Sequence, residues 1–132
     1  MNIMKYIIII FLLIFVFIIS CNNEYNQILS NVDRIKIIAD IDKNDYVELI
    51  NKQEVKTFLK FLKTRSLHIT PCGFVDGWIE FYDINNNLII NAWFNFQCKQ
   101  MIFSYNDTHY DIKISDKGII YLKNITNNVN RY

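Results

Sequence analysis

The chain has 132 residues, a formal net charge of +1 and 52% hydrophobic residues. This length is enough for one hydrophobic core and too short for two. The near-neutral charge excludes the broad basic surface that nucleic-acid binding requires, so we expect a small globular domain with no nucleic-acid partner.

The first twenty residues have the pattern of an export signal. A single cation, Lys5, precedes residues 6–19, a segment of fourteen residues without a charge. A membrane-spanning helix needs about 18–20 apolar residues, and this segment is shorter. Its length is typical of the apolar region of a signal peptide.

The end of this leader, Ile18-Ile19-Ser20-Cys21, resembles a bacterial lipobox, although that family prefers Leu at the position of Ile18. The resemblance implies cleavage before Cys21, acyl chains such as palmitate on its thiol, and acylation of the new amino group. Stable anchoring takes more than one lipid chain, which this modification supplies. The resemblance therefore implies a protein of the cell envelope, held at a membrane through Cys21 and facing the periplasm or the outside.

Two alternatives remain open for the leader: an ordinary cleaved signal with a chance cysteine, and an uncleaved anchor. Both keep the domain outside the cytoplasm. The predicted organisation is a signal peptide at 1–20, a polar tether at 21–31, a single domain at 32–126 and a frayed tail at 127–132.

Residues 34–41 read as a strand with Ile35 and Ile37 on one face. A turn at 42–45 returns the chain into a second strand at 46–50. The acids near this turn lack the glycine and the terminal glutamate of an EF-hand, which favours a solvated turn over a calcium loop. These acids are Asp40, Asp42, Asp45 and Glu48.

The main predicted helix begins after Asn51, whose side chain can cap it together with Glu54. Its apolar stripe has the spacing i, i+3, i+4 and i+7. The stripe consists of Val55, Phe58, Leu59 and Leu62. Four lysines occupy the remaining surface, either as a solvated face or as a basic face toward anionic lipid headgroups. They are Lys52, Lys56, Lys60 and Lys63.

Residues 78–82 and 88–96 predict a β-hairpin closed by the turn 83–87. The register that separates apolar from polar side chains puts Phe81 opposite Ile90, and Ile79 opposite Ala92. The other face then pairs Trp78 with Trp93, Glu80 with Asn91, and Tyr82 with Ile89. Aromatic side chains beside polar groups are common recognition surfaces. The candidate binding face consists of Trp78, Glu80, Tyr82, Asn91, Trp93 and Asn95.

An alternative for this face stays open. The C-terminal helix or the connection 66–73 could cover it, in which case the tryptophans would belong to the core.

Cys72 and Cys98 remain as an even pair once Cys21 is assigned to the anchor, and outside the cytoplasm such a pair predicts a disulfide. The hairpin register also brings them near its open end, with a bulge or loop near Gly73. A zinc site with His68 or His109 is disfavoured, because no ligand pair has the close spacing of structural zinc sites. We expect no metal and no cofactor.

Residues 101–105 and 109–114 predict a second hairpin around Asn106-Asp107. Ser115 can cap a short last helix that docks Ile119 and Leu122, although a strand is also possible there. The whole predicts an α+β fold of two layers: an antiparallel sheet of five or six strands against one main helix and a short C-terminal helix.

Ser104, His109 and Asp111 invite comparison with a hydrolytic triad, but two residues along one strand are about 6.6 Å apart, too far for the oriented hydrogen bond. Without a glycine-rich phosphate loop or a nucleophile elbow, we expect no enzyme. The sequence predicts a lipid-anchored binding or accessory protein with an unknown protein or small-molecule partner. The alternatives are an inhibitor of a secreted hydrolase, acting through loop 66–73 or 83–87, and a small envelope hydrolase.

Overall fold

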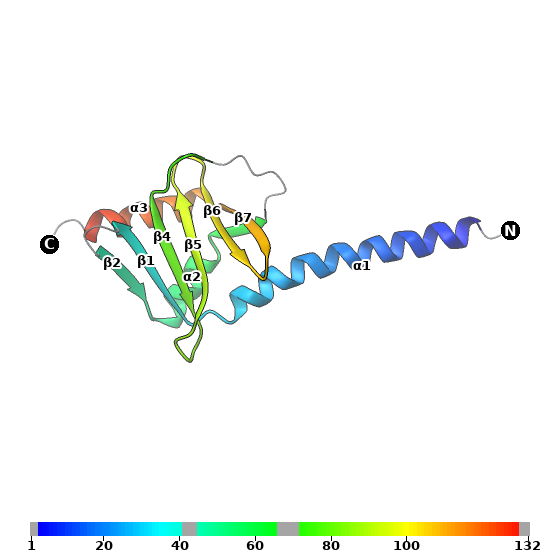
Figure 1. Cartoon of the computed structure of the whole chain (residues 1–132), viewed down its shortest axis with the longest axis horizontal. Coiled ribbons are helices and arrows are strands. Elements are labelled where there is room, and N and C mark those ends of the chain that lie inside the picture. The colour runs from blue at the N-terminus through cyan, green and yellow to red at the C-terminus, as the bar shows by residue number, and fades with distance from the viewer. Residues whose placement is uncertain (1–2, 41–44, 66–71, 130–132) are drawn as a thin grey trace. The chain divides into compact units, whose positions relative to one another are not determined.

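The computed structural model describes residues 3–40, 45–65 and 72–129, and the chain divides into two compact units, Met1–Asn31 and Val32–Tyr132 (Figure 1). The first unit is helix α1, Ile3–Ser30. The predicted cleavage site before Cys21 and most of the predicted tether lie within this helical stretch. In the described part of the chain, no helix combines the length and apolar character that crossing a membrane requires.

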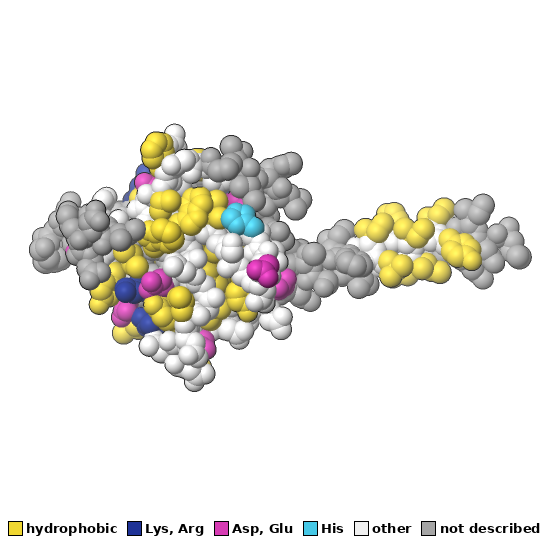
Figure 2. Space-filling view, in the orientation of Figure 1, with side chains coloured by type: hydrophobic (Ala, Val, Ile, Leu, Met, Phe, Trp, Pro, Cys, Tyr) yellow, Lys and Arg dark blue, Asp and Glu magenta, His cyan; other side chains and the backbone are white. Residues whose placement is uncertain are grey.

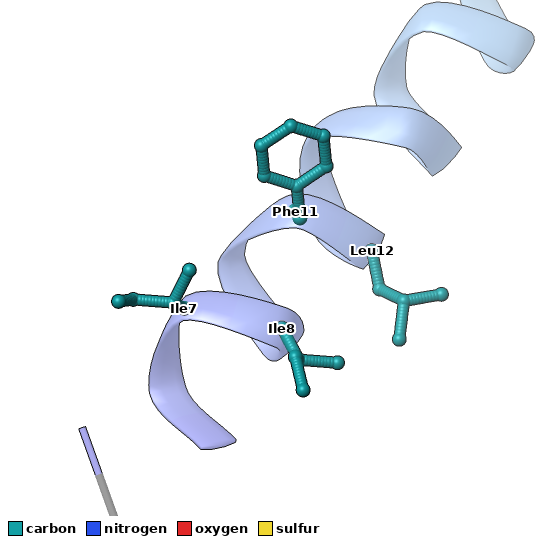
Figure 3. A pocket seen from close by; sticks show the side chains of 4 residues that line it. All are labelled: Ile7, Ile8, Phe11 and Leu12. Atoms are coloured by element: carbon teal, nitrogen blue, oxygen red, sulfur yellow. The ribbon is translucent and has the colours of Figure 1, made fainter. Parts of the chain in front are cut away.

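Residues 6–14 of α1 are hydrophobic and exposed on all sides of the helix. Figure 3 shows Ile7, Ile8, Phe11 and Leu12 pointing outward around a shallow depression, and each is more than half exposed. The depression has no convergent polar groups, and its residues belong to the predicted signal peptide. It forms no part of the candidate site.

The second unit is an antiparallel sheet with two helices, α2 and α3. The strands pair in the order β2-β1-β4-β5-β6-β7-β3. The helices are α2 (Lys52–Leu59) and α3 (Asp116–Val129). The strands are β1 (Arg34–Asp40), β2 (Asp45–Leu49), β3 (Leu62–Arg65), β4 (Gly77–Tyr82), β5 (Leu88–Asn95), β6 (Gln100–Tyr105) and β7 (Thr108–Ile114).

The predicted α+β class is confirmed. The sheet has seven strands, where five or six were expected. The additional one is β3, a four-residue strand at the edge of the sheet. Both helices contact β1 and β2, and Figure 1 shows them on the same side of the sheet. The core lies between that side, here called the inner face, and the helices. Its fully buried side chains include Ile35, Ile79, Phe81, Phe58, Ile112 and Leu122.

The main helix is shorter than predicted. It ends at Leu59, and Leu62 lies in β3 opposite Ile114 of β7. The amide of Phe61 donates to the carbonyl of Phe58, and the carbonyl of Phe61 accepts from Ser115, so the chain turns there. Pairing with the edge of β7 therefore overrides the helical spacing, while Leu62 is still buried.

The C-terminal element is a helix, which was one of the two alternatives left open. It was expected to be short, but with 14 residues it is longer than the 8-residue α2. The hydroxyl of Ser115 accepts from the amide of Gly118, which confirms the predicted cap. Ile119 and Leu122 are buried as predicted. The helix continues to Val129, past the residue at which the sequence placed the end of the domain.

The first predicted hairpin is confirmed in four of its five pairs. Trp78 lies opposite Trp93, Ile79 opposite Ala92, Glu80 opposite Asn91, and Phe81 opposite Ile90. The pairing of Tyr82 with Ile89 was wrong. The register shifts after Phe81 and brings Tyr82 opposite Leu88, because a bulge leaves one extra residue in β5.

The second hairpin, β6–β7, is confirmed around Asn106-Asp107. Both turn residues have positive φ, 47° and 59°, as a type I′ turn requires. Phe103 and Tyr110 are opposite each other on the inner face with their rings stacked at 4.9 Å. The tight turn thus fixes which side chains of this hairpin enter the core.

Candidate functional site

The sheet carries a second face opposite the helices, here called the outer face. Antiparallel registers across six strands align one side chain per strand in a row on this face. Figure 2 shows hydrophobic side chains gathered there, with acidic and basic side chains beside them. The row consists of Tyr46, Ile38, Trp78, Trp93, Ile102 and Asp111.

The alternative that the C-terminal helix covers the tryptophans is excluded, because α3 packs on the inner face. Trp78 and Trp93 lie directly opposite each other and are both partly exposed. The other covering segment that the sequence suggested, residues 66–73, lies largely outside the described residues. The two indoles therefore form an aromatic platform on the outer face.

Trp78 also holds an unsatisfied donor. Its indole Nε1–H is buried and has no hydrogen-bond acceptor in the described part of the chain. A buried donor left without a partner costs about 1–3 kcal/mol. The polar end of the Trp78 ring therefore points into the protein, and the apolar part of the ring forms the partly exposed surface.

A charged network lies beside the platform in the next row of the sheet. Lys36 stands between Glu48 and Glu80 in the register, with its Nζ 3.8 Å from Glu80 Oε2 and 4.5 Å from the ring centroid of Tyr46. The hydroxyl of Tyr82 donates to Glu80 Oε2 at 2.6 Å. This hydrogen bond to a carboxylate is the main reason that the pKa of Tyr82 is raised.

Arg34 closes the network at the edge of the hairpin turn. Its guanidinium lies 3.9 Å from the ring centroid of Tyr82 and donates to Glu48 Oε1 at 2.6 Å. It also donates to Asn86 Oδ1 at 2.5 Å. Charges and rings are thus held in one geometry, while Asn91, opposite Glu80, remains exposed and available to a partner.

Asn95 does not belong to the exposed face, contrary to the prediction. Its side chain is 2% exposed. Its Nδ2 donates to the carbonyl of Phe74, and its Oδ1 accepts from the amide of Cys98. It shares the side of the sheet with Trp93, but its polar atoms hold the chain at the open end of the hairpin.

The predicted disulfide between Cys72 and Cys98 lies at that same end. Cys72 and Cys98 have Cα atoms 6.2 Å apart, within the range that the bond requires. The carboxylate of Asp76 accepts from the amide of Phe96, which adds a second tie between the chain before β4 and the chain after β5. The disulfide and these polar contacts fix the end of the hairpin next to the tryptophans.

Ser104, His109 and Asp111 are on the same face, yet their geometry does not match a triad. Ser104 Oγ lies 3.4 Å from His109 Nδ1, whereas a triad serine faces Nε2 and leaves Nδ1 for the carboxylate. Asp111 is 1% exposed, and its Oδ2 accepts from Gln100 Nε2 at 3.3 Å. Burial raises the pKa of Asp111, and His109 opposes this shift.

The hairpin turn 83–87 is held by hydrogen bonds of its own and is largely exposed. The Asp83 carboxylate accepts from the amides of Asn85 and Asn87 and from the side chain of Asn87, and these bonds lower its pKa, the side-chain bond most. Asn86 has a φ of 64°, and Ile84 beside it is 74% exposed. The turn presents one apolar side chain on a rigid frame.

Sequence reasoning missed Lys36, Arg34 and Tyr46 as parts of the outer face. In β1 and β2 these side chains alternate with Ile35 and Ile37, which point to the inner face. This alternation alone indicates that the three residues point to the outer face. Their neighbours, however, depend on β1 lying beside β4, and local pattern does not reveal that pairing.

Among the residues that the structure describes, no three acidic, histidine or cysteine side chains group as metal ligands. His68 lies outside those residues. Comparison of the chain with protein-family models, with curated proteins and with solved structures finds no match.

Proposed function

We propose that this protein is a lipid-anchored domain of the cell envelope that binds a partner through its outer face. The anchor would be Cys21, and the binding face would be Trp78, Glu80, Tyr82, Asn91 and Trp93. The observation that carries the binding proposal is the Trp78–Trp93 pair. It is partly exposed on a sheet face that neither α2 nor α3 covers.

The polar surroundings of the pair support recognition. Large rigid side chains bury area at a low cost in entropy, and the charged groups beside them are held by mutual contacts before any partner arrives. The exposed side chain of Asn91 offers a further directional contact. The partner would be a protein or a small molecule with apolar surface and a hydrogen-bonding group.

The anchor is tested by mass. In a bacterial host, we expect the N-terminal peptide of the protein to start at Cys21 and to carry the mass of its acyl chains. The variant Cys21→Ser should lose both the acyl mass and the cleavage before residue 21, because the thiol is the acceptor. A cleaved, membrane-held Cys21→Ser product would contradict the proposal.

The binding face is tested by site-specific photo-crosslinking in the native membrane. A benzophenone amino acid at the exposed position Asn91 is expected to give one adduct of discrete mass, and Trp93→Ala should abolish that adduct. The matched control is the same probe at Asn124, an exposed position on α3. No adduct at position 91, or the same adduct from both positions, would refute the binding face.

A specific observation favours one second candidate, an inhibitor of a secreted hydrolase. Such an inhibitor needs a protruding and rigid loop, and the turn 83–87 has an exposed Ile84 on a frame that Asp83 fixes. The photo-crosslinker at position 84 separates the two candidates. An adduct that forms at 84 and survives Trp93→Ala would favour the inhibitor.

A further inference from the structure

Among the residues whose burial the structure describes, the two helices of the second unit carry most of the exposed cations. The surface they form, α2 with its C-cap Lys60 and α3, is here called the helical layer. Its exposed charges are five lysines and two acids, an excess of three cations. They are Lys52, Lys56, Lys60, Lys117 and Lys123, with Glu54 and Asp116.

The chain from Cys21 onward has thirteen basic and thirteen acidic residues, so it is formally neutral. An excess of three cations in the helical layer therefore leaves an excess of three acids in the rest of that chain. On the outer face, Arg34 and Lys36 are already engaged with Glu48 and Glu80. The helical layer thus carries a net positive charge, while the remainder of that chain carries a net negative one.

The lysines are regularly spaced on each helix. Lys52, Lys56 and Lys60 are four residues apart, so successive turns of α2 present them along one line. Lys117 and Lys123 flank Ile120, an apolar side chain that is 60% exposed. Lysines around an exposed isoleucine on a helix are typical of surfaces that lie against a membrane interface.

The two helices are fixed to each other as one body. The ring of Tyr121 in α3 lies 6.1 Å from that of Phe58 and 5.5 Å from that of Phe61. Phe61 also lies against Gly118. A Cβ atom added to Gly118 would come within 2.6 Å of the Cβ of Phe61. The lysines of the two helices are therefore carried by one rigid layer.

The proposed anchor brings such a surface within reach. Residues 21–31 span at most about 40 Å when fully extended, and attraction between exposed charges acts over about 8 Å at physiological salt. Each lysine near an anionic membrane surface increases the binding constant of a basic segment about fivefold.

We propose that the helical layer docks on the anionic surface of the membrane that holds the anchor, so that the outer face of the sheet turns away from the bilayer. The occupant is a lipid surface with negative headgroups, and Ile120 is the apolar contact at its interface. This inference rests on the proposed lipidation of Cys21. It adds an orientation, which that function does not require.

The test uses the lipidated protein in vesicles of phosphatidylcholine alone and with 30% phosphatidylglycerol. An amine-acylating reagent is applied briefly, and modification of each lysine is read by mass spectrometry. In anionic vesicles we expect modification of the helical-layer lysines to slow about fivefold or more, and high salt should restore it. Lys113, exposed on the outer face, is the internal control and should react alike in both.

A matched pair of variants isolates the charge. Replacing Lys52, Lys56 and Lys60 together by glutamine should lower the docked-to-undocked ratio about a hundredfold and expose Lys117 and Lys123 to the reagent. Lys113→Gln should leave the protection unchanged. These exposed substitutions leave the core untouched, so folding is not at stake.

Equal modification in the two kinds of vesicle would overturn the docking, as would protection of Lys113 together with the others. The N-terminal peptide of the same digest reports the acyl mass. An acylated peptide with equal lysine rates refutes the docking alone, whereas a peptide without acyl chains refutes the anchor and the orientation that depends on it.

Discussion

Replacing Phe81 by alanine is expected to lower the free energy of unfolding by about 3–5 kcal/mol. Phe81 is fully buried on β4, between Ile35 of β1 and Ile90 of β5. Truncation leaves a cavity that two paired strands and the helices above them cannot fill without distortion. Urea denaturation followed by the fluorescence of the two tryptophans measures the change.

The matched control is Ile84→Ala, three residues further along the chain. Ile84 is 74% exposed, so this truncation should change the free energy of unfolding by less than about 0.5 kcal/mol. A Phe81→Ala protein as stable as Ile84→Ala would mean that the inner face of β4 is not the centre of the core.

Removing the disulfide is expected to cost about 3.5 kcal/mol of unfolding free energy. Cys72 and Cys98 are 26 residues apart, and the bond restrains that length of chain in the unfolded state. The double variant Cys72→Ala/Cys98→Ala is compared with the oxidised protein by the same urea titration. A reducing agent should destabilise the natural protein and leave the double variant unchanged.

The loss should also be visible on the outer face. The bond ties the chain before β4 to the chain after β5, so the double variant should expose Trp78 and Trp93 more to the quencher acrylamide. Unfolding midpoints that agree within error would contradict a bond between these two cysteines.

The hairpins were predictable because their information is local. Alternation in β4 and β5 allows only one register that keeps Ile79 and Phe81 in the core, and the structure has that register. Asn106-Asp107 likewise defines a two-residue turn by its tolerance of positive φ. The bulge beside Tyr82 was not predictable, because one extra residue in a strand leaves the alternation on either side almost intact.

The end of α2 could not be predicted either. Leu62 fits the apolar stripe of a helix, and it is buried in a strand as well, so its hydrophobicity does not decide between them. The deciding contact is with Ile114, 52 positions later in the chain. Asn95 shows the same limit. Alternation correctly predicts the face of the sheet to which it points, but its burial depends on a contact with the chain before β4.

The candidate face was predictable as far as its two strands reach. Trp78, Glu80, Asn91 and Trp93 follow from the hairpin register alone. Their neighbours from β1 depend on the order of strands in the sheet, which local sequence does not encode. Prediction therefore found the centre of the site and missed the charged side that adjoins it.

For a chain exported amino end first, as proposed above, the strand order β2-β1-β4-β5-β6-β7-β3 has a consequence. Strands β1 and β2 emerge as a hairpin, but the second edge of β1 stays open until β4 follows, after α2, β3 and the connection between β3 and β4. The partner of β3 is β7, which follows still later in the chain. During the proposed export two strand edges would therefore be available for mispairing, and a holding chaperone at the exit side would protect them until the last hairpin arrives.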